Sequence, residues 1–425
     1  KISGYDIKVN AGEVNEGEDA TIIVVLPKDA TGNVTLVMNN KPYFAKVSDG
    51  MAKVVVPSVS AGTHDFIVNY SGDDKYDKST VNGTIKVNKK AATLIVEDLV
   101  KYYKGDEKLT AKLVDGRGNP IANADVAFNI NGKDYIRKTN NEGIASMNIN
   151  LVAGTYNVAV KYNESSVNVT VTVKSTIVAD DLVKMYQDPT RFYAKFLDST
   201  GKALANTQVR FNINGVFYTK TTNNDGVADL GIMLRPGTYI LTAYNPANGE
   251  ERGITITVKS LIVQSDLTKY YLNASRFQAT IYNKDGSLAV NKEVTFNING
   301  VFYHKTTDSN GVASLGIALR PGEYIITTIV DGLDIGNKVT VLPTLVTKDL
   351  DMKYLDGSDF TAQTLDGQGN PLANQNVSFN VNGVFYHKVT DKDGIASLKI
   401  RLMSGEYIIT SYWNNFQTGN TIKIA

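Results

Sequence analysis

The chain has 425 residues, with 44 Lys and Arg against 43 Asp and Glu, so its formal net charge is +1. This balance argues against electrostatic capture of nucleic acid or anionic lipid. The absence of cysteine excludes disulfides, thiolate nucleophiles and cysteine metal sites. No apolar run reaches the roughly 18 residues that a membrane-spanning helix needs. With three histidines and no repeated catalytic constellation, we expect a protein that is not an enzyme and needs no cofactor or metal.

The sequence repeats itself at an interval close to 84 residues, given by the differences 83, 85 and 83 between successive copies of one motif. The motif Phe-Asn-(Ile/Val)-Asn-Gly begins at Phe128, Phe211, Phe296 and Phe379. The repeat predicts one divergent and four similar domains, at 1–90, 91–174, 175–259, 260–342 and 343–425. Almost no spacer separates one unit from the next, so we expect stiff joints.

Apolar residues alternate with polar ones inside each unit. Val126, Phe128 and Ile130 share one face, as in a strand with one buried side. In the second unit the pattern predicts seven strands, near 93–103, 108–115, 125–131, 133–139, 144–151, 155–163 and 167–173. The first unit is less regular, with strands expected near 20–26, 33–39, 43–47, 51–56, 64–70 and 81–87. The predicted fold class is all-β, a tandem array of immunoglobulin-like β-sandwich domains forming an extended rod.

Two further features recur in each of the four similar units. An Asn-Gly pair between two alternating runs predicts a tight hairpin, because both turn residues need φ > 0; the pairs are Asn131-Gly132, Asn214-Gly215, Asn299-Gly300 and Asn382-Gly383. A tyrosine follows each Gly-x step, at Tyr156, Tyr239, Tyr324 and Tyr407. We expect a buried ring whose hydroxyl fastens a corner to the backbone, in preference to an aromatic platform for sugars.

Candidate metal and crosslink residues also recur, but with exceptions between the units. The loop that starts at Asp115 and recurs at Asp366 could hold calcium, and so could the acidic residue before leucine at Asp98, Asp181, Asp266 and Asp349. We favour turns between strands for the loop and capped turns for the acidic residues. Lys101, Lys184 and Lys269 could form crosslinks to asparagine, but Met352 replaces them in the fifth unit. We therefore expect neither a crosslink nor a required metal.

A few residues break the repeat. Trp413 and Phe416, near the end of the last unit, depart from the aromatic pattern and are the candidate contact surface. His304 and His387 occupy a position that carries Thr219 and Ile136 in other units, so we interpret these histidines as surface residues. We expect the central units to act as spacers and recognition to lie elsewhere or at the two ends, where the divergent first unit and the Trp413–Phe416 patch are placed.

The order Asp-x-x-Gly-x-Pro from Asp115, followed by Val126 and Phe128, Gly132, Thr139 to Ala145, and Gly154 to Tyr156, resembles bacterial immunoglobulin-like repeats of the invasin/intimin type. The variants from Phe211 and Leu234 look still more like repeats of adhesin-like surface proteins in methanogenic archaea. The resemblance covers 91–425 well, and 1–90 only as a generic unit of this kind.

The resemblance implies an extracellular, cell-surface rod and brings no catalytic residues. We expect a non-catalytic adhesin-like stalk that projects or mediates attachment. Its partners would be other cells, surface polysaccharide or protein. The alternative is a subunit of a pilus-like or sheath-like extracellular filament, in which the partners are neighbouring subunits.

Overall fold

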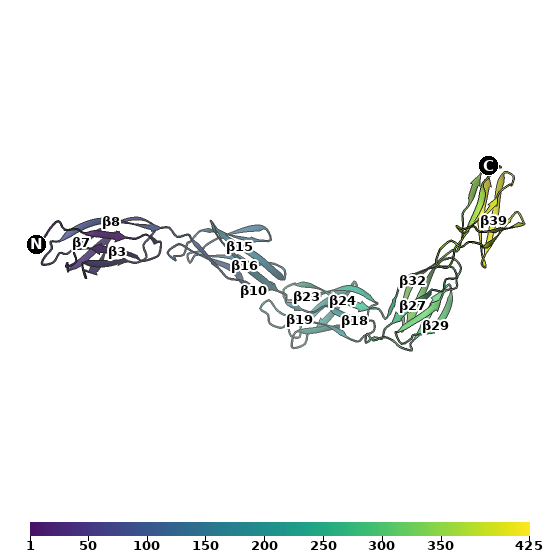
Figure 1. Cartoon of the computed structure of the whole chain (residues 1–425). Helices are drawn as coiled ribbons and strands as arrows, with labels where there is room; N and C mark the ends of the chain where they lie inside the picture. Colours follow the sequence, from purple (N-terminus) through teal and green to yellow (C-terminus); the bar gives the residue numbers. More distant parts are fainter.

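The computed structural model describes residues 1–425 as an all-β chain of 40 strands without a helix. None of its elements is therefore a helix that could cross a membrane. Five similar units follow one another end to end and form an extended, gently bent rod with the two termini at opposite ends (Figure 1). Every unit consists of one sheet of three strands and one sheet of five.

The strand order is the same in all five units. In each unit the strands are named in their order across the sheet, with the three-stranded sheet first and the five-stranded sheet second. The first unit contains β1 (Lys8–Ala11), β3 (Ala20–Val25), β6 (Met51–Val56) and β2 (Val14–Asn15), β8 (Ser79–Asn88), β7 (Gly62–Tyr70), β4 (Asn33–Met38), β5 (Lys41–Lys46). The second contains β9 (Thr93–Val96), β11 (Lys108–Val114), β14 (Ile144–Asn148) and β10 (Leu99–Tyr102), β16 (Ser165–Lys174), β15 (Gly154–Tyr162), β12 (Asp125–Ile130), β13 (Lys133–Lys138).

The remaining three units repeat this arrangement. The third contains β17 (Ile177–Val178), β19 (Arg191–Phe196), β22 (Val227–Gly231) and β18 (Leu182–Met185), β24 (Glu251–Lys259), β23 (Gly237–Tyr244), β20 (Gln208–Ile213), β21 (Val216–Thr221). The fourth contains β25 (Ile262–Gln264), β27 (Arg276–Ile281), β30 (Val312–Gly316) and β26 (Leu267–Tyr270), β32 (Leu333–Leu342), β31 (Gly322–Val330), β28 (Glu293–Ile298), β29 (Val301–Thr306). The fifth contains β33 (Leu345–Thr347), β35 (Asp359–Thr364), β38 (Ile395–Lys399) and β34 (Leu350–Met352), β40 (Phe416–Ile424), β39 (Gly405–Trp413), β36 (Asn376–Val381), β37 (Val384–Val389).

The single strand predicted over 93–103 is wrong, because the structure divides it into two strands that belong to different sheets. β9 pairs antiparallel with β11, whereas β10 pairs parallel with β16. The chain crosses between the sheets at Asp98, whose carboxylate accepts the backbone N–H of Thr170 at 2.8 Å. Asp181, Asp266 and Asp349 accept equivalent bonds at 2.8–2.9 Å. The sequence predicted that these acidic residues cap a turn, whereas the structure shows that their carboxylates bond the last strand of the unit.

The first unit also gains two strands that the sequence did not predict. β1 pairs antiparallel with β3, and the two-residue β2 pairs parallel with β8. Their residues are at most half-buried, so the apolar alternation that predicts a strand is weak there.

Each unit has its own core between its two sheets. Val126, Phe128 and Ile130 are buried on the inner face of β12, as the alternation predicted. In the third unit the rings of Phe192 and Phe211 cross the core edge to face, with centroids 5.8 Å apart. The fourth and fifth units repeat this ring pair. A unit is thus closed around its own apolar centre, and the features that join units lie at its two ends.

Candidate functional site: the junctions between units

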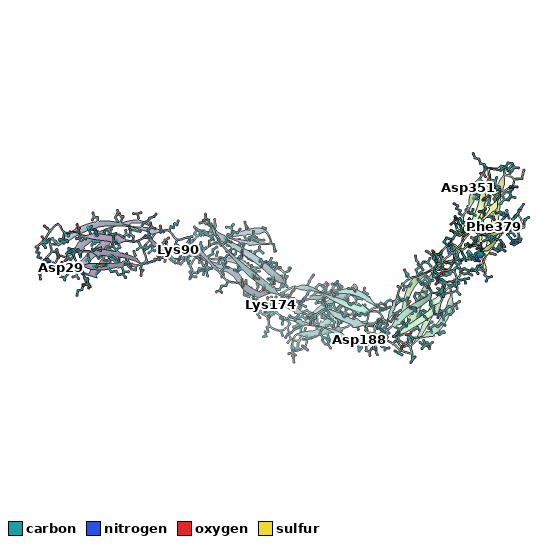
Figure 2. The ribbon with its side chains drawn as sticks, in the orientation of Figure 1. Asp29, Lys90, Lys174, Asp188, Asp351 and Phe379 are labelled. Atoms are coloured by element: carbon teal, nitrogen blue, oxygen red, sulfur yellow. The ribbon has the colours of Figure 1, made fainter.

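Very short linkers join the last strand of one unit to the first strand of the next. Two residues separate β16 from β17, β24 from β25 and β32 from β33, and four separate β8 from β9. Figure 2 shows Lys90, Lys174 and Asp188 at successive joins along the rod. The contacts around these linkers determine how far neighbouring units can move.

A buried lysine stands at the exit end of the second, third and fourth units. Lys101, Lys184 and Lys269 are only 3–5% exposed. Lys101 Nζ donates to the carbonyl oxygens of Gly105 and Ile149, at 2.5 and 2.8 Å. Lys184 and Lys269 bond the equivalent carbonyls of their own units. All of these partners are main-chain carbonyls, so each ammonium joins a loop to the end of a strand in the opposite sheet.

Burial lowers the pKa of all three lysines, because an ammonium loses its hydration inside the protein. The charge-assisted hydrogen bonds to carbonyl oxygens offset this cost. Without the lysine, those carbonyls would lose their donor. The sequence showed lysine at this position but gave no sign of its carbonyl partners, which come from residues four and 48 positions later.

The loop that each lysine holds is the one that contacts the next unit. We call it the junction loop, which comprises residues 103–107, 186–190, 271–275 and 353–358 in units two to five. In the fourth unit, Lys269 binds the carbonyl of Asn273, and the Asn273 side-chain amide donates to the carbonyl of Gly367 in the fifth unit at 2.6 Å. In the third, Gln187 donates to the carbonyl of Asp331 in the fourth unit at 3.0 Å.

A tyrosine beside the junction loop packs closely on a glycine of the following unit. A Cβ on Gly201 would lie 2.5 Å from the ring of Tyr102, and a Cβ on Gly369 would lie 2.4 Å from the ring of Tyr270. Gly369 belongs to the loop that starts at Asp366. The Asp366 carboxylate accepts two backbone N–H groups of its own loop, from Gln368 and Asn370. This loop is therefore a turn, as expected, and it also receives the preceding unit.

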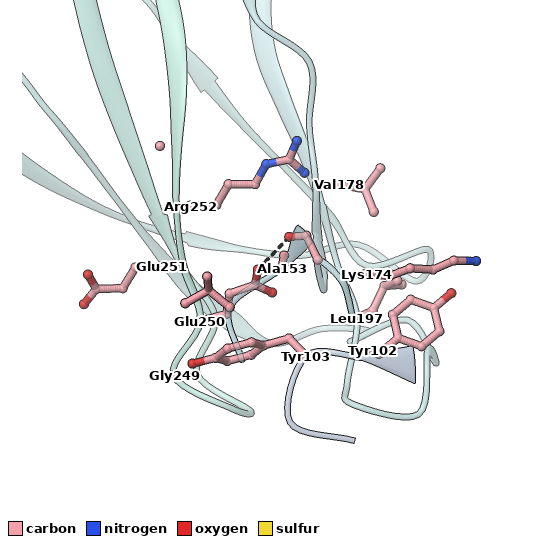
Figure 3. Close-up of a pocket in the computed structure, with 13 residues that line it drawn as sticks. Tyr102, Tyr103, Ala153, Lys174, Val178, Leu197, Gly249, Glu250, Glu251 and Arg252 are labelled. Atoms are coloured by element: carbon pink, nitrogen blue, oxygen red, sulfur yellow. Dashed lines mark hydrogen bonds between the residues drawn. The ribbon is translucent and has the colours of Figure 1, made fainter. Parts of the chain in front are cut away.

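The junction between the second and third units carries an additional polar cluster. The loop 245–250 is longer than the equivalent turns and brings the buried Glu250 to the linker. Its carboxylate accepts hydrogen bonds from the Ser175 hydroxyl at 2.7 Å, and from the Thr176 amide and hydroxyl at 2.6 Å each. A dashed line in Figure 3 marks a hydrogen bond of the Glu250 carboxylate. The only signal in the sequence was the longer interval of 85 residues.

A groove of about 900 Å³ lies at this same junction. Tyr102 and Tyr103 line it from the second unit, and Glu250 and Arg252 line it from the third (Figure 3). Glu250 is bonded to the linker, and the Arg252 guanidinium donates to the carbonyl of Ile177. Glu250 and Arg252 therefore already have partners within the chain.

The predicted turns and corners form. The four asparagines of the Asn-Gly pairs have φ of 53–54° and the glycines 77–78°, which is the left-handed geometry that this hairpin needs. The hydroxyls of Tyr156, Tyr239, Tyr324 and Tyr407 each donate to a carbonyl four residues earlier, at 2.6–2.8 Å. Each hydroxyl thus bonds the backbone near the start of its strand, and the rings are half-buried where the sequence predicted buried ones.

The candidate contact surface lies elsewhere than expected. The turn that carries Trp413 and Phe416 faces the fourth unit, and the Phe416 ring packs on Tyr271 with centroids 5.7 Å apart. Trp413 is half-buried and donates to Gln375 at 3.3 Å. The expected position at one end of the rod is wrong, because the turn between β39 and β40 lies at the end of its unit where the chain enters. A role for Trp413 and Phe416 in binding a partner stays a prediction.

No group of three or more His, Asp or Glu side chains lies close enough together to hold a metal ion. His304 and His387 are exposed and bond Thr295 and Ser378 on the neighbouring strand, which agrees with their interpretation as surface residues.

Comparison with known proteins finds sequence relatives and solved structures of low similarity. No protein-family model matches the chain. The inverse autotransporter adhesin YeeJ of Escherichia coli K12 is 22% identical over 485 aligned residues, which cover 97% of this chain and 20% of YeeJ. The chain thus spans about a fifth of that relative. The match supports the resemblance to bacterial adhesin repeats, whereas the finer likeness to archaeal surface proteins has no support.

Two solved structures illustrate the structural comparison. Invasin, a bacterial integrin-binding protein, is 13% identical, with 93% of this chain and 100% of invasin covered and a TM-score of 0.29. A Ca²⁺-stabilized adhesin with which an Antarctic bacterium binds ice is 16% identical, with 81% and 100% covered and a TM-score of 0.20.

Proposed function

We propose that this chain is a non-catalytic stalk segment of an extracellular, cell-surface adhesin, which projects a binding part away from the cell and bears tension. The similarity to an adhesin along 97% of the chain supports the adhesin role. Other cells, surface polysaccharide or surface protein are the proposed partners of the whole adhesin.

One observation supports the proposal that the chain bears tension. In every unit the second strand pairs parallel with the last strand, as β10 does with β16 from Leu99↔Val171 to Tyr102↔Lys174. Tension along the rod pulls the start of β10 and the end of β16 in opposite directions. All hydrogen bonds between the two strands are then loaded together, instead of breaking one after another.

Single-molecule pulling tests this geometry, and the absence of native cysteine allows handles at chosen positions. Handles at K90C and K174C pull β10 and β16 in shear. Handles at K90C and N163C provide the matched control. Lys90 and Asn163 line one hollow at the entry end of the second unit. Pulling these two positions apart separates the strands one hydrogen bond at a time. We expect a several-fold higher unfolding force for the first pair. Equal forces would contradict the load-bearing role.

The shape of the whole chain gives a second test. At roughly 3.3 Å per residue, strands of about seven residues give sheets near 23 Å, and with loops each unit reaches about 40 Å. Five units in line therefore extend over roughly 200 Å. Small-angle scattering should give an elongated particle of this length, and a compact radius of gyration would contradict the projecting role.

The alternative function is a subunit of a pilus-like or sheath-like filament, and the edge strands favour it as the second candidate. β21, β29 and β37 each lie at the edge of a five-stranded sheet and expose a phenylalanine, at Phe217, Phe302 and Phe385. Unpaired edges with exposed apolar side chains can add a strand from another chain. Growth of the particle with protein concentration, abolished by F217K/F302K/F385K, would favour the filament over the stalk.

A further inference from the structure

One arginine on the outer face of the third unit has no partner of opposite charge. Arg210 lies on β20 and is exposed, and its guanidinium makes neither an ion pair nor a hydrogen bond within the chain. Its guanidinium carbon lies 4.3 Å from the centre of the Phe217 ring and 5.9 Å from that of Tyr244. The two rings lie 6.0 Å apart on the strands on either side of β20.

This stacking orients the guanidinium without occupying its hydrogen-bond donors. An arginine binds aromatic rings through the faces of its planar group, whereas its N–H groups point outward in the plane. Two neighbouring N–H groups match the two oxygens of a carboxylate. Arg210 is thus held in place by Phe217 and Tyr244, and its own charge remains unpaired on an exposed surface.

The surroundings of Arg210 are suited to a sugar. Thr219 is directly opposite Arg210 on β21, and Asn212 and Thr242 are opposite each other on β20 and β23, which provides hydroxyl and amide groups beside the arginine. Phe217 is 52% exposed, so part of its ring is free to contact the C–H face of a pyranose. Thr242 in turn is opposite Gly253, which has no side chain of its own and lies beside a methyl group of Ile240.

We propose that Arg210, Phe217 and Tyr244 form a binding site for a carboxylate-bearing sugar, such as a uronic acid residue of an anionic polysaccharide. Arg210 receives the carboxylate, and the aromatic rings contact the sugar ring. Glu251, which is opposite Tyr244 on β24, is two strands from Arg210, or roughly 9–10 Å at the usual strand spacing. Its negative charge confines the sugar carboxylate to the Arg210 side of the face.

The fifth unit supplies a comparison within the same chain. Phe385 and Tyr412 form an almost identical ring pair, 6.0 Å apart at an angle of 42°, against 40° for Phe217 and Tyr244. In the third unit Arg210 is opposite Tyr244, whereas in the fifth unit Ser378 is opposite Tyr412. The aromatic pair is therefore shared, and the unpaired charge is particular to the third unit. The sequence predicted that the central units act only as spacers, and a binding site on the third unit would be an exception to that prediction.

The test measures binding of the full chain to immobilised polygalacturonate, with fully methyl-esterified polygalacturonate and polyglutamate as comparison surfaces. We expect binding to polygalacturonate alone, lowered about tenfold or more by R210S, which is the loss expected for charge-assisted bonds to one guanidinium. R210S copies the fifth unit, so folding should be unaffected. The double variant R210S/S378R should recover binding, since it rebuilds the site on the fifth unit.

Three outcomes would overturn the proposal: no binding by the natural chain, equal binding by R210S, or equal binding to the esterified polymer. Equally tight binding to polyglutamate would also overturn it, because an acidic peptide would then satisfy the site. The proposal is independent of the stalk function, since particle length and unfolding force do not depend on Arg210.

Discussion

The exit ends of the fourth and fifth units hold the same loop in two different ways. In the fourth unit Lys269 bonds the carbonyls of Asn273 and Ile317, and so joins the junction loop to the end of β30. In the fifth unit Met352 takes the place of the lysine, and the Ile400 amide donates directly to the Ser358 carbonyl at 3.2 Å. The backbone conformation is shared, with φ of 64° at Leu272 and 55° at Leu355.

This difference shows that the lysine is not needed to form the loop. Its ammonium, however, holds the carbonyl of Asn273, whose side chain bonds the following unit. The second, third and fourth units carry the lysine, and it joins the contacts of their junction loops to the core of their own unit, whereas the first unit contacts the second without it. We infer that the lysine contributes to the rigidity of a junction more than to the choice of fold.

The largest effect is expected from removing one of these lysines. In K269M the carbonyls of Asn273 and Ile317 lose a buried charged donor, which we expect to destabilise the fourth unit by about 3 kcal/mol. Hydrogen exchange should rise in residues 271–275 and at the contact with Gly367. Unchanged protection of this loop in K269M would contradict the role of the lysine.

The reverse substitution is the matched control. M352K places a lysine in the fifth unit, where the loop is already closed by the bond between Ile400 and Ser358. We expect a change well below that of K269M, because the bond from the Ile400 amide already joins the loop to the end of the strand when methionine is present. A gain in stability as large as the loss in K269M would mean that the direct bond does not replace the lysine.

The second-largest effect is expected at the junction between the second and third units, which has the Glu250 carboxylate in addition to the buried Lys101. E250A removes the acceptor of three hydrogen bonds from Ser175 and Thr176, and we expect a loss of about 2–3 kcal/mol in the third unit. The particle should also bend more freely between the second and third units, seen as a shorter maximum dimension in small-angle scattering. E251A, on the exposed neighbouring residue, is the control and should change neither quantity.

Much of the fold could be predicted from the sequence because it depends on local patterns. The alternation around Phe128 gave a strand, and Asn131-Gly132 gave its turn, since both follow from the geometry of a few neighbouring residues. The division of the predicted strand at Asp98 was missed, because it depends on a bond to Thr170, 72 residues away.

The site residues were harder to predict for the same reason. Lys101, Lys184 and Lys269 were noticed, but their partners are carbonyls, which every residue has. Phe416 was noticed as an exception to the repeat, yet its contact with Tyr271 crosses a junction. The ring pair that holds Arg210 joins three strands, and no local pattern brings them together.

A smaller, pH-dependent effect should be common to the fourth and fifth units. Hydrogen bonds from Asn337 and from the Lys338 amide lower the pKa of Asp266, and the Thr421 amide and Asn420 lower that of Asp349. A carboxylate whose pKa is lowered on folding adds stability above its unfolded pKa of about 4, and this is lost as the pH falls through the folded value. The melting temperature of D266N should therefore lie below that of the natural chain at pH 7 and approach it near pH 2. D349N should behave in the same way, and a difference that persists at pH 2 would contradict the charge as its cause.

The smallest effect is expected at the tyrosine corners, which the two units also share. Tyr324 donates to the carbonyl of Arg320 at 2.7 Å, and Tyr407 to that of Met403 at 2.8 Å. Both hydroxyls are near the surface, so water can replace the lost donor, and we expect Y324F and Y407F to cost about 0.5–1 kcal/mol each. Calorimetry of the two variants should show equal losses, because the corner is the same whether the neighbouring loop is held by Lys269 or not. A clearly larger loss for Y324F would show that the corner and the buried lysine act together, and the junction loop would then have to be treated as one cooperative structure with the corner beside it.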